Sequence, residues 1–179
     1  MIEFEIQRLI ARQWRDADFA PFALLNADPQ VMEYFPACLS RAESDAQAER
    51  IQALMSEQGW GFWALEEKSS QQFIGFTGLN IPAPDLPCSP CTEIGWRLAR
   101  EFWGKGYASE AARGALAVGF EQLQLPEIVS FTSIHNQKSQ AVMQRLGMVR
   151  DALHFQHPKV AVGHRLREHC LYRLAAPSA

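Results

Sequence analysis

The chain has 179 residues, of which 47% are hydrophobic and 21% charged, a composition typical of one globular domain with its own core. Seventeen Lys and Arg stand against twenty Asp and Glu, for a net charge of −3, and the scattered basic residues are not a nucleic-acid footprint. No apolar run is long enough to span a bilayer, and acidic residues rather than a signal peptide follow Met1. We expect one domain over residues 1–179, in the cytoplasm, with neither nucleic-acid nor membrane partners.

The first sixty residues predict an edge strand and two helices. Residues 3–11 alternate apolar and polar side chains, which favours a strand. Asp16 and Asp18 open a short helix with apolar residues behind them. Ser40-Arg-Ala-Glu43 is a capping box that begins an amphipathic helix, and Gly59 ends it.

Three strands are predicted next, over residues 61–66, 72–79 and 92–98, joined as a meander. The last connection, IPAPDLPCSPC, has four prolines in eleven residues and carries Cys88 and Cys91. A structural zinc site usually needs a second cysteine pair, and a redox pair needs the start of a helix. We therefore expect reduced cysteines in an exposed connector, with no metal.

The remaining sequence alternates helices and strands. Its predicted elements are a helix at 107–123, a strand at 128–134, a helix at 137–146 stopped by Gly147, and strands at 148–155 and 168–174. Strands followed by a strand-helix-strand-helix unit predict an α+β sheet with helices on its faces.

A glycine-rich turn, WGKGYAS, precedes the helix that begins near Tyr107. The first N–H groups of a helix have no internal partner, and the helix dipole adds positive charge there. Glycines just before the helix let these groups converge on a phosphate. Because Lys105 is followed by Gly106 and not by Ser or Thr, the turn is not a Walker loop, and it lacks the glycine spacing of a Rossmann fingerprint. The heptapeptide alone also permits a turn that binds nothing.

Two longer stretches, EIGWRLAREFWGKGYASEAARGALAVGF and SIHNQKSQAVMQRLGM, add to this picture. Together they resemble the GNAT acyltransferase superfamily, in particular its RimJ/RimL-type branch of N-terminal and small-amine acetyltransferases. The resemblance extends over about residues 4–174. Trp103 stands where the family signature has Gln or Arg, while Gly106 and Ala108 match its small residues.

The resemblance implies an α+β GNAT fold, with a mostly antiparallel sheet of six to seven strands, about four helices, and a splay between two central parallel strands. A bulge at Gly95 is expected to open that splay. It also implies acetyl-CoA as co-substrate and no metal. The implied acetyl-CoA-binding residues are Trp96, Arg97 and Leu98 along the strand, Trp103, Gly104, Lys105, Gly106, Tyr107, Ala108 and Ser109 at the turn, and Asn136 before the next helix.

Two residues are implied to move protons. Many superfamily members carry a tyrosine acid at the position of Met143, which has no proton to give, so Ser139 is the candidate acid. Glu93 is the candidate base, because an ammonium must lose a proton before it can attack. Simpler interpretations stay open: Asn136 as a helix cap, Glu93 as a rim glutamate, and acceleration by positioning alone.

The function implied is an N-acetyltransferase that moves an acetyl group from acetyl-CoA to a primary amine of a protein N-terminus or small molecule, by direct attack in a ternary complex. The alternative is a CoA-binding sensor without turnover. Glu43, Asp45, Glu49 and Glu57 are compatible with a cationic acceptor or with a solvated helix face. The histidine-containing segment at 154–169 is expected to border the acceptor pocket, and a monomer and a homodimer are both open.

Overall fold

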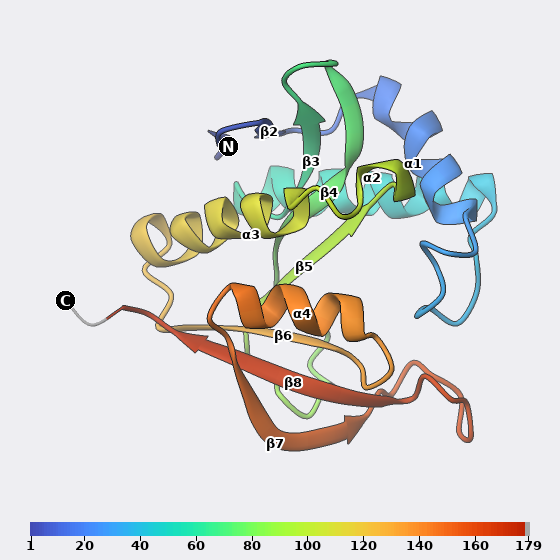
Figure 1. Cartoon of the computed structure of the whole chain (residues 1–179), viewed down its shortest axis with the longest axis vertical. Coiled ribbons are helices and arrows are strands. Elements are labelled where there is room, and N and C mark those ends of the chain that lie inside the picture. The colour runs from blue at the N-terminus through green and yellow to red at the C-terminus, as the bar shows by residue number, and fades with distance from the viewer. Residues whose placement is uncertain (178–179) are drawn as a thin grey trace.

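The computed structural model describes residues 1–177 and contains one mixed sheet with helices on both faces (Figure 1). The helices are α1 (Phe19–Ala27), α2 (Arg41–Gln58), α3 (Tyr107–Ala117) and α4 (Gln137–Arg145). The strands are β1 (Phe4–Glu5), β2 (Leu9–Arg12), β3 (Phe62–Glu67), β4 (Gln72–Asn80), β5 (Glu93–Leu98), β6 (Glu127–Ser133), β7 (Val149–Gln156) and β8 (Glu168–Ala175). None of the helices in this part of the chain is both long and apolar enough to cross a membrane.

The sheet has the order β1-β2-β3-β4-β5-β6-β8-β7, and all neighbours are antiparallel except β5 and β6. These two central strands share one register pair, Glu93 with Val129. One further link follows, from the Ser130 hydroxyl to the Ile94 carbonyl at 2.9 Å. Figure 1 shows the two strands diverging beyond this point, with α3 and α4 in front of the opening. The predicted fold class and splay are confirmed.

The sheet has eight strands, so the expected count of six to seven was too low. The single edge strand predicted over residues 3–11 is divided in two, because the chain turns back on itself. Ile6 N–H donates to the Leu9 carbonyl at 3.0 Å, and β1 pairs with β2. A hairpin and a continuous strand share the same alternation of side chains, so the pattern alone did not separate them.

The bulge expected at Gly95 is also wrong. The register of β4 with β5 runs without interruption from Gly75–Leu98 to Asn80–Glu93. The splay arises on the other side of β5, because β6 stays paired with β8 along its whole length and leaves β5 after one pair. Gly95 instead makes room for a ring, since a Cβ there would lie 3.3 Å from the Phe62 side chain.

The predicted helix ends are confirmed for α2 and α4. Ser40 and Glu43 form both bonds of the capping box at α2, and Gly59 ends that helix in the left-handed conformation. Asn136 caps α4, and Gly147 follows its last turn with φ +79°. By contrast, α3 begins without any side-chain cap.

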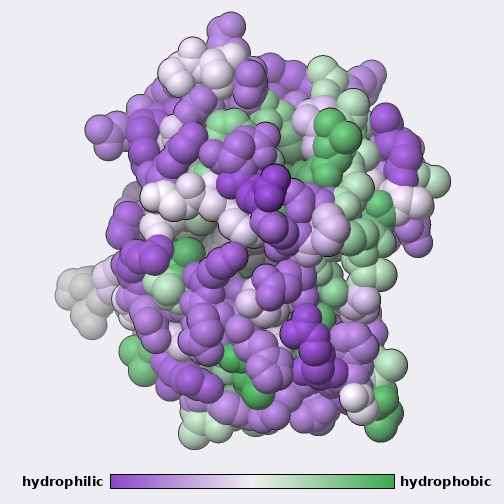
Figure 2. All heavy atoms as spheres, turned by 45° about the vertical axis from the view of Figure 1, so that its right-hand side comes forward, coloured by the Kyte–Doolittle hydropathy of each residue, from purple (hydrophilic) through white to green (hydrophobic). Residues whose placement is uncertain are grey.

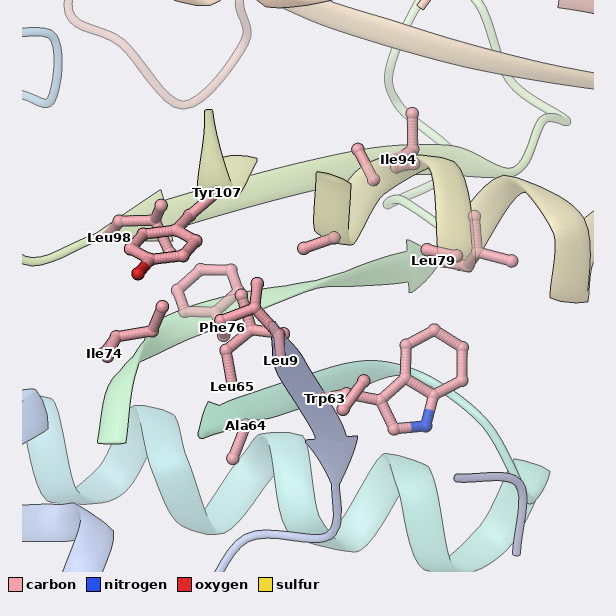
Figure 3. Close-up of a cluster of buried hydrophobic side chains, with 14 of the residues drawn as sticks. Leu9, Trp63, Ala64, Leu65, Ile74, Phe76, Leu79, Ile94, Leu98 and Tyr107 are labelled. Atoms are coloured by element: carbon pink, nitrogen blue, oxygen red, sulfur yellow. The ribbon is translucent and has the colours of Figure 1, made fainter. Parts of the chain in front are cut away.

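The main core lies between the helices and the sheet. Figure 3 shows buried side chains of β2, β3 and β4, among them Leu9, Leu65, Ile74 and Leu79, with Trp63 of β3 near Leu9. All five side chains are fully buried, and the Trp63 indole N–H donates to the Ile2 carbonyl at 2.7 Å. Burial of this much apolar surface is the main stabilising contribution to such a domain.

A second, smaller cluster lies on the other half of the sheet. It contains Leu86, Cys88, Val129, Phe155 and Leu171. The proline-rich connection is therefore folded against β6, β8 and β7, and its interpretation as an exposed connector was wrong. Both cysteines are free thiols, with sulfur atoms 3.7 Å apart.

Candidate active site

The turn at residues 103–106 has the geometry that the glycines predicted. Gly104 and Gly106 have φ of +73° and +83°, in the left-handed region that favours glycine. A Cβ on Gly104 would meet nothing within 4 Å, so the backbone conformation, and not packing, requires glycine there. Beyond it, the first internal bond of α3 runs from Glu110 N–H to the Gly106 carbonyl at 3.0 Å.

The start of α3 therefore presents free N–H groups. Tyr107, Ala108 and Ser109 occupy its first turn, whose amides have no acceptor within the helix. No side chain caps them, unlike the first turns of α2 and α4. An uncapped helix start with the dipole behind it is a site for an anion.

Contacts on the far side of the turn hold it in place. The Tyr107 hydroxyl donates to the Glu67 carboxylate, and this hydrogen bond raises the pKa of Tyr107, which stays protonated. The Arg8 guanidinium lies 4.3 Å from the centroid of the Tyr107 ring and donates to the Lys105 carbonyl at 3.0 Å. Glu110 accepts from both the Arg8 main chain and its side chain, each at 2.7 Å. These contacts fix the turn without using its amides.

Main-chain groups on one edge of β5 have no partner strand. Ala99 N–H donates to the Ile74 carbonyl of β4 at 2.9 Å. Because successive residues of a strand direct their peptide groups to opposite edges, those of Trp96 and Leu98 face the diverging β6. The Leu98 carbonyl accepts from the Trp103 indole at 2.8 Å. The remaining groups of this edge are free to bind an extended ligand as an added strand would.

Arg97 is placed differently from its two neighbours. Its side chain lies on the opposite face of β5, where it donates to Asn26 of α1 at 2.6 Å, while Leu98 lies beside Tyr107 of α3 (Figure 3). Of the three predicted β5 residues, Arg97 therefore lies on one face of the sheet and Trp96 and Leu98 lie on the other.

The first turn of α4 lies beside the opening. Asn136 accepts from Ser139 N–H at 3.1 Å and donates to the Thr132 hydroxyl at 3.1 Å, so its capping role is confirmed. Ser139 is half-buried in this turn. Met143 is buried in the main core and cannot line the site. For Asn136 and Ser139, a role toward acetyl-CoA stays a prediction.

Two basic residues of α4 were missed by the sequence interpretation. Lys138 places its Nζ 4.6 Å from the centroid of the Trp103 ring, and Arg145 donates to the Ser109 hydroxyl at 3.5 Å. They are seven residues apart, a spacing that puts both on one face of a helix. That spacing was the available signal, and it brings positive charge to the first turn of α3.

Glu93 lies where β5 and β6 are still paired. Its carboxylate is half-buried and accepts from the Asn80 side-chain amide at 2.7 Å. Burial raises the pKa of Glu93, while the Asn80 hydrogen bond and the charge of Lys159 oppose that rise. Asn80 has no local sequence signal, because it meets Glu93 only through the β4–β5 register.

The histidine-containing segment forms the end of β7, the connection that follows and the start of β8. The rings of His157 and His169 pack against each other at a tilt, with centroids 4.8 Å apart. Burial lowers the pKa of His169 to about 4, so it is neutral at pH 7. In the part of the chain that the structure describes, no three metal-binding side chains come together. The connection between β7 and β8 also contacts the segment between α1 and α2, where Arg165 donates to the Glu33 carbonyl at 3.1 Å.

One face of the molecule is mixed in character. Figure 2 shows hydrophilic side chains over most of it, with apolar side chains gathered along its right-hand side. The diverging pair of parallel strands beside an uncapped, glycine-started helix is the arrangement expected from the resemblance to the GNAT acyltransferases.

Comparison with known proteins agrees with this class. Residues 8–149 match the family model described as an acetyltransferase (GNAT) domain, and the chain belongs to the GNAT acetyltransferase family. The uncharacterized protein YkkB of Bacillus subtilis is 33% identical over 144 residues, covering 79% of this chain and 81% of YkkB.

Two further matches carry more informative names. FsC-acetyl coenzyme A-N(2)-transacetylase of Aspergillus fumigatus is 32% identical over 133 residues, which cover 69% of this chain and 55% of that protein. A solved structure of RimL, a ribosomal L7/L12 alpha-N-protein acetyltransferase in complex with coenzyme A, superimposes with a TM-score of 0.78 over 98% of both chains. Its sequence identity is 14%, so this likeness concerns the fold.

Proposed function

We propose that this acetyltransferase moves an acetyl group from acetyl-CoA to a primary amine, of a protein N-terminus or a small molecule, by direct attack in a ternary complex. The observation that carries the proposal is the parting of β5 and β6 immediately beside the uncapped start of α3. Among the four α-helices of the described residues, only α3 has an uncapped first turn that directly follows two glycines with positive φ.

The residues at this corner suit the parts of acetyl-CoA. The amides of the first turn of α3 would hold the diphosphate, with Lys105 and Arg145 supplying positive charge. The pantetheine arm would lie along the free edge of β5 at Trp96 and Leu98. Trp103 and Asn136 would border it.

When bound, acetyl-CoA supplies a thioester carbonyl as the electrophile. The amine nitrogen forms the new C–N bond as the C–S bond breaks. Glu93 takes the proton that the amine loses, and its raised pKa makes it a better base than an exposed glutamate. Ser139 gives a proton to the departing sulfur and regains one from solvent. The Leu98 N–H is available to stabilise negative charge on the carbonyl oxygen.

Glu93 and Ser139 come from different sides of the opening. By strand alternation Glu93 shares the face of Arg97, which α1 covers, whereas Ser139 belongs to α4, which packs beside α3 on the other face. If the acceptor amine approaches from the face of the sheet that α1 covers and the thiol leaves on the face that α4 covers, the base is needed at Glu93 and the acid at Ser139.

Titration calorimetry with acetyl-CoA, followed by assay of CoA release against a panel of amines, tests the proposal. We expect binding and turnover with at least one amine. Binding without transfer to any amine would favour the sensor instead, and no heat of binding would overturn the assignment of the corner to CoA.

A further inference from the structure

A buried arginine without an acidic partner lies next to the proposed site of transfer. Arg97 is 9% exposed, and its only side-chain hydrogen bond within residues 1–177 goes to the Asn26 amide oxygen at 2.6 Å. Its Nε is buried and has no partner. The rings of Phe35 and Phe76 lie 4.1 and 5.4 Å from the guanidinium and cover it. A buried cation with an unpaired donor would be stabilised by an anion beside it.

Arg12 is a second buried arginine in this chain, and its charge is neutralised by acidic partners. It is 5% exposed and pairs with both Asp18 and Glu66 at 2.7 Å. Burial opposes its charge, but the two carboxylates outweigh that effect and raise the pKa of Arg12. Burial lowers the pKa of Arg97 to about 10, with no opposing carboxylate, and it is still cationic at pH 7. The difference between the two sites is a missing anion.

Arg97 lines a pocket between α2 and the connection from α1. The pocket has a volume of about 510 Å³, within the range of small-molecule sites. A second polar atom without a partner, the Gln47 side-chain oxygen, belongs to its wall. The rest of the wall is mostly apolar and includes Met32, Phe35 and Leu39, while Glu43 and Arg50 are its other charged members.

From these observations we propose that the acceptor of this enzyme carries a carboxylate as well as its amine, that Arg97 binds the carboxylate, and that the pocket takes an apolar side chain. The proposal rests on the proposed function and narrows its acceptor to an amino acid with an apolar side chain. An amino acid within a protein N-terminus has no free α-carboxylate, and a polyamine has none at all.

The position of Arg97 on β5 fits this role. Glu93, Gly95 and Arg97 share one face of the strand, and neighbours on a face are about 6.6 Å apart. Glu93 and Arg97 are therefore about 13 Å apart along the strand. An amino acid bound over Gly95, between them, could direct its amine toward Glu93 and its carboxylate toward Arg97. The same face turns toward the pocket and away from α3.

The acidic residues of α2 do not offer a competing site for a cation. Glu43 is occupied by the capping box with Ser40, and Asp45 pairs with Arg41 on the preceding turn. Glu49 and Glu57 are exposed. The structure thus supports the solvated helix face over the cationic acceptor.

Matched acceptors test the proposal directly. L-phenylalanine and L-methionine differ from their amides only in the carboxylate. We expect the wild-type kcat/KM to favour the acids by about tenfold or more. Arg97→Met should lower kcat/KM for the acids by about 30-fold while leaving the amides within about threefold. The control is Arg100→Met, because Arg100 is exposed and donates a hydrogen bond to Gln30. This change should alter kcat/KM for neither the acids nor the amides.

Stability separates a binding role from a structural one. Arg97→Met removes an uncompensated buried charge at nearly constant volume but also removes the donor to the buried Asn26 oxygen. Because these two effects oppose each other, the melting temperature should stay nearly equal. A lower melting temperature, with acids and amides losing activity equally, would show that Arg97 only supports the fold. A wild-type enzyme that prefers the amides would also overturn the proposal.

Ligand binding without turnover keeps the two proposals distinguishable. 3-Phenylpropionate carries the carboxylate and ring but no amine, and 3-phenylpropanamide is its neutral match. We expect the first, and not the second, to raise the melting temperature of the wild type but not of Arg97→Met. This result would support the carboxylate site even if acetyl-CoA did not bind. Equal effects of the two probes would refute the carboxylate site but leave the proposed acetyltransferase function untouched.

Discussion

The Nζ of Lys138 lies 4.6 Å from the centroid of the Trp103 ring. The same indole donates through its N–H to the Leu98 carbonyl at 2.8 Å. One side chain thus joins the first turn of α4, the glycine turn and the end of β5. The two sequence segments that resemble the family therefore meet at one corner of the fold, where β5 and β6 part.

The glycine turn can be tested by comparing two alanine substitutions. Gly104 and Gly163 both have positive φ, and neither would place a Cβ within 4 Å of another group. Each change should therefore cost a similar, small amount of stability, about 1 kcal/mol. Only Gly104→Ala should weaken acetyl-CoA binding, by about tenfold, in titration calorimetry. Equal affinities for the two variants would show that the turn does not hold the diphosphate.

Glu93 as the base predicts a particular pH dependence. A base acts when ionised, so kcat/KM should rise with pH through the Glu93 pKa, which burial raises above its ordinary value. Asn80 stabilises the ionised carboxylate, so Asn80→Ala should move this limb to higher pH. Glu93→Gln should lower kcat by about 100-fold and abolish the limb.

The acceptor amine also titrates, and the Asn80 variant provides the control. A change at Asn80 leaves the pKa of the free amine untouched. If the limb has the same midpoint in wild type and Asn80→Ala, it belongs to the amine, and Glu93 is not the base.

Gly75 is predicted to be essential for packing between β4 and β5. A Cβ at this position would lie 2.1 Å from the Arg97 carbonyl oxygen and 2.8 Å from the Leu98 Cα. Because both are backbone atoms, no side chain can move aside. Gly75→Ala should lower the free energy of unfolding by about 3 kcal/mol or more in urea denaturation. Gly163→Ala is the matched control, and a comparable loss there would refute the steric explanation.

The four cysteines should differ sharply in reactivity. Cys38 is exposed, whereas Cys88 and Cys170 are buried and Cys91 is half-buried. Burial raises the pKa of Cys91 to about 12 and also raises that of Cys170, which keeps them as unreactive thiols. Native protein should release one rapid equivalent in a dithionitrobenzoate assay, and all four after unfolding. Cys38→Ser should remove the rapid phase; a rapid phase that remains would contradict the buried cysteine pair.

Local signals in the sequence were sufficient for most elements. The capping box at Ser40, the cap at Asn136 and the stop residues Gly59 and Gly147 act on groups within a few residues, so they were readable without the fold. The family resemblance was also readable from the sequence, because each of the two segments that carry it, residues 93–120 and 133–148, is one continuous stretch.

Tertiary structure decided what depends on partners distant in the chain. Asn80 meets Glu93 through strand register, and Cys88 meets Phe155 through the fold of a connection onto a sheet. The face on which Arg97 lies, and the absence of a carboxylate beside it, are likewise invisible in the sequence. Sequence patterns report periodicity and local hydrogen bonding, whereas burial, register and charge pairing arise only when separate segments pack together.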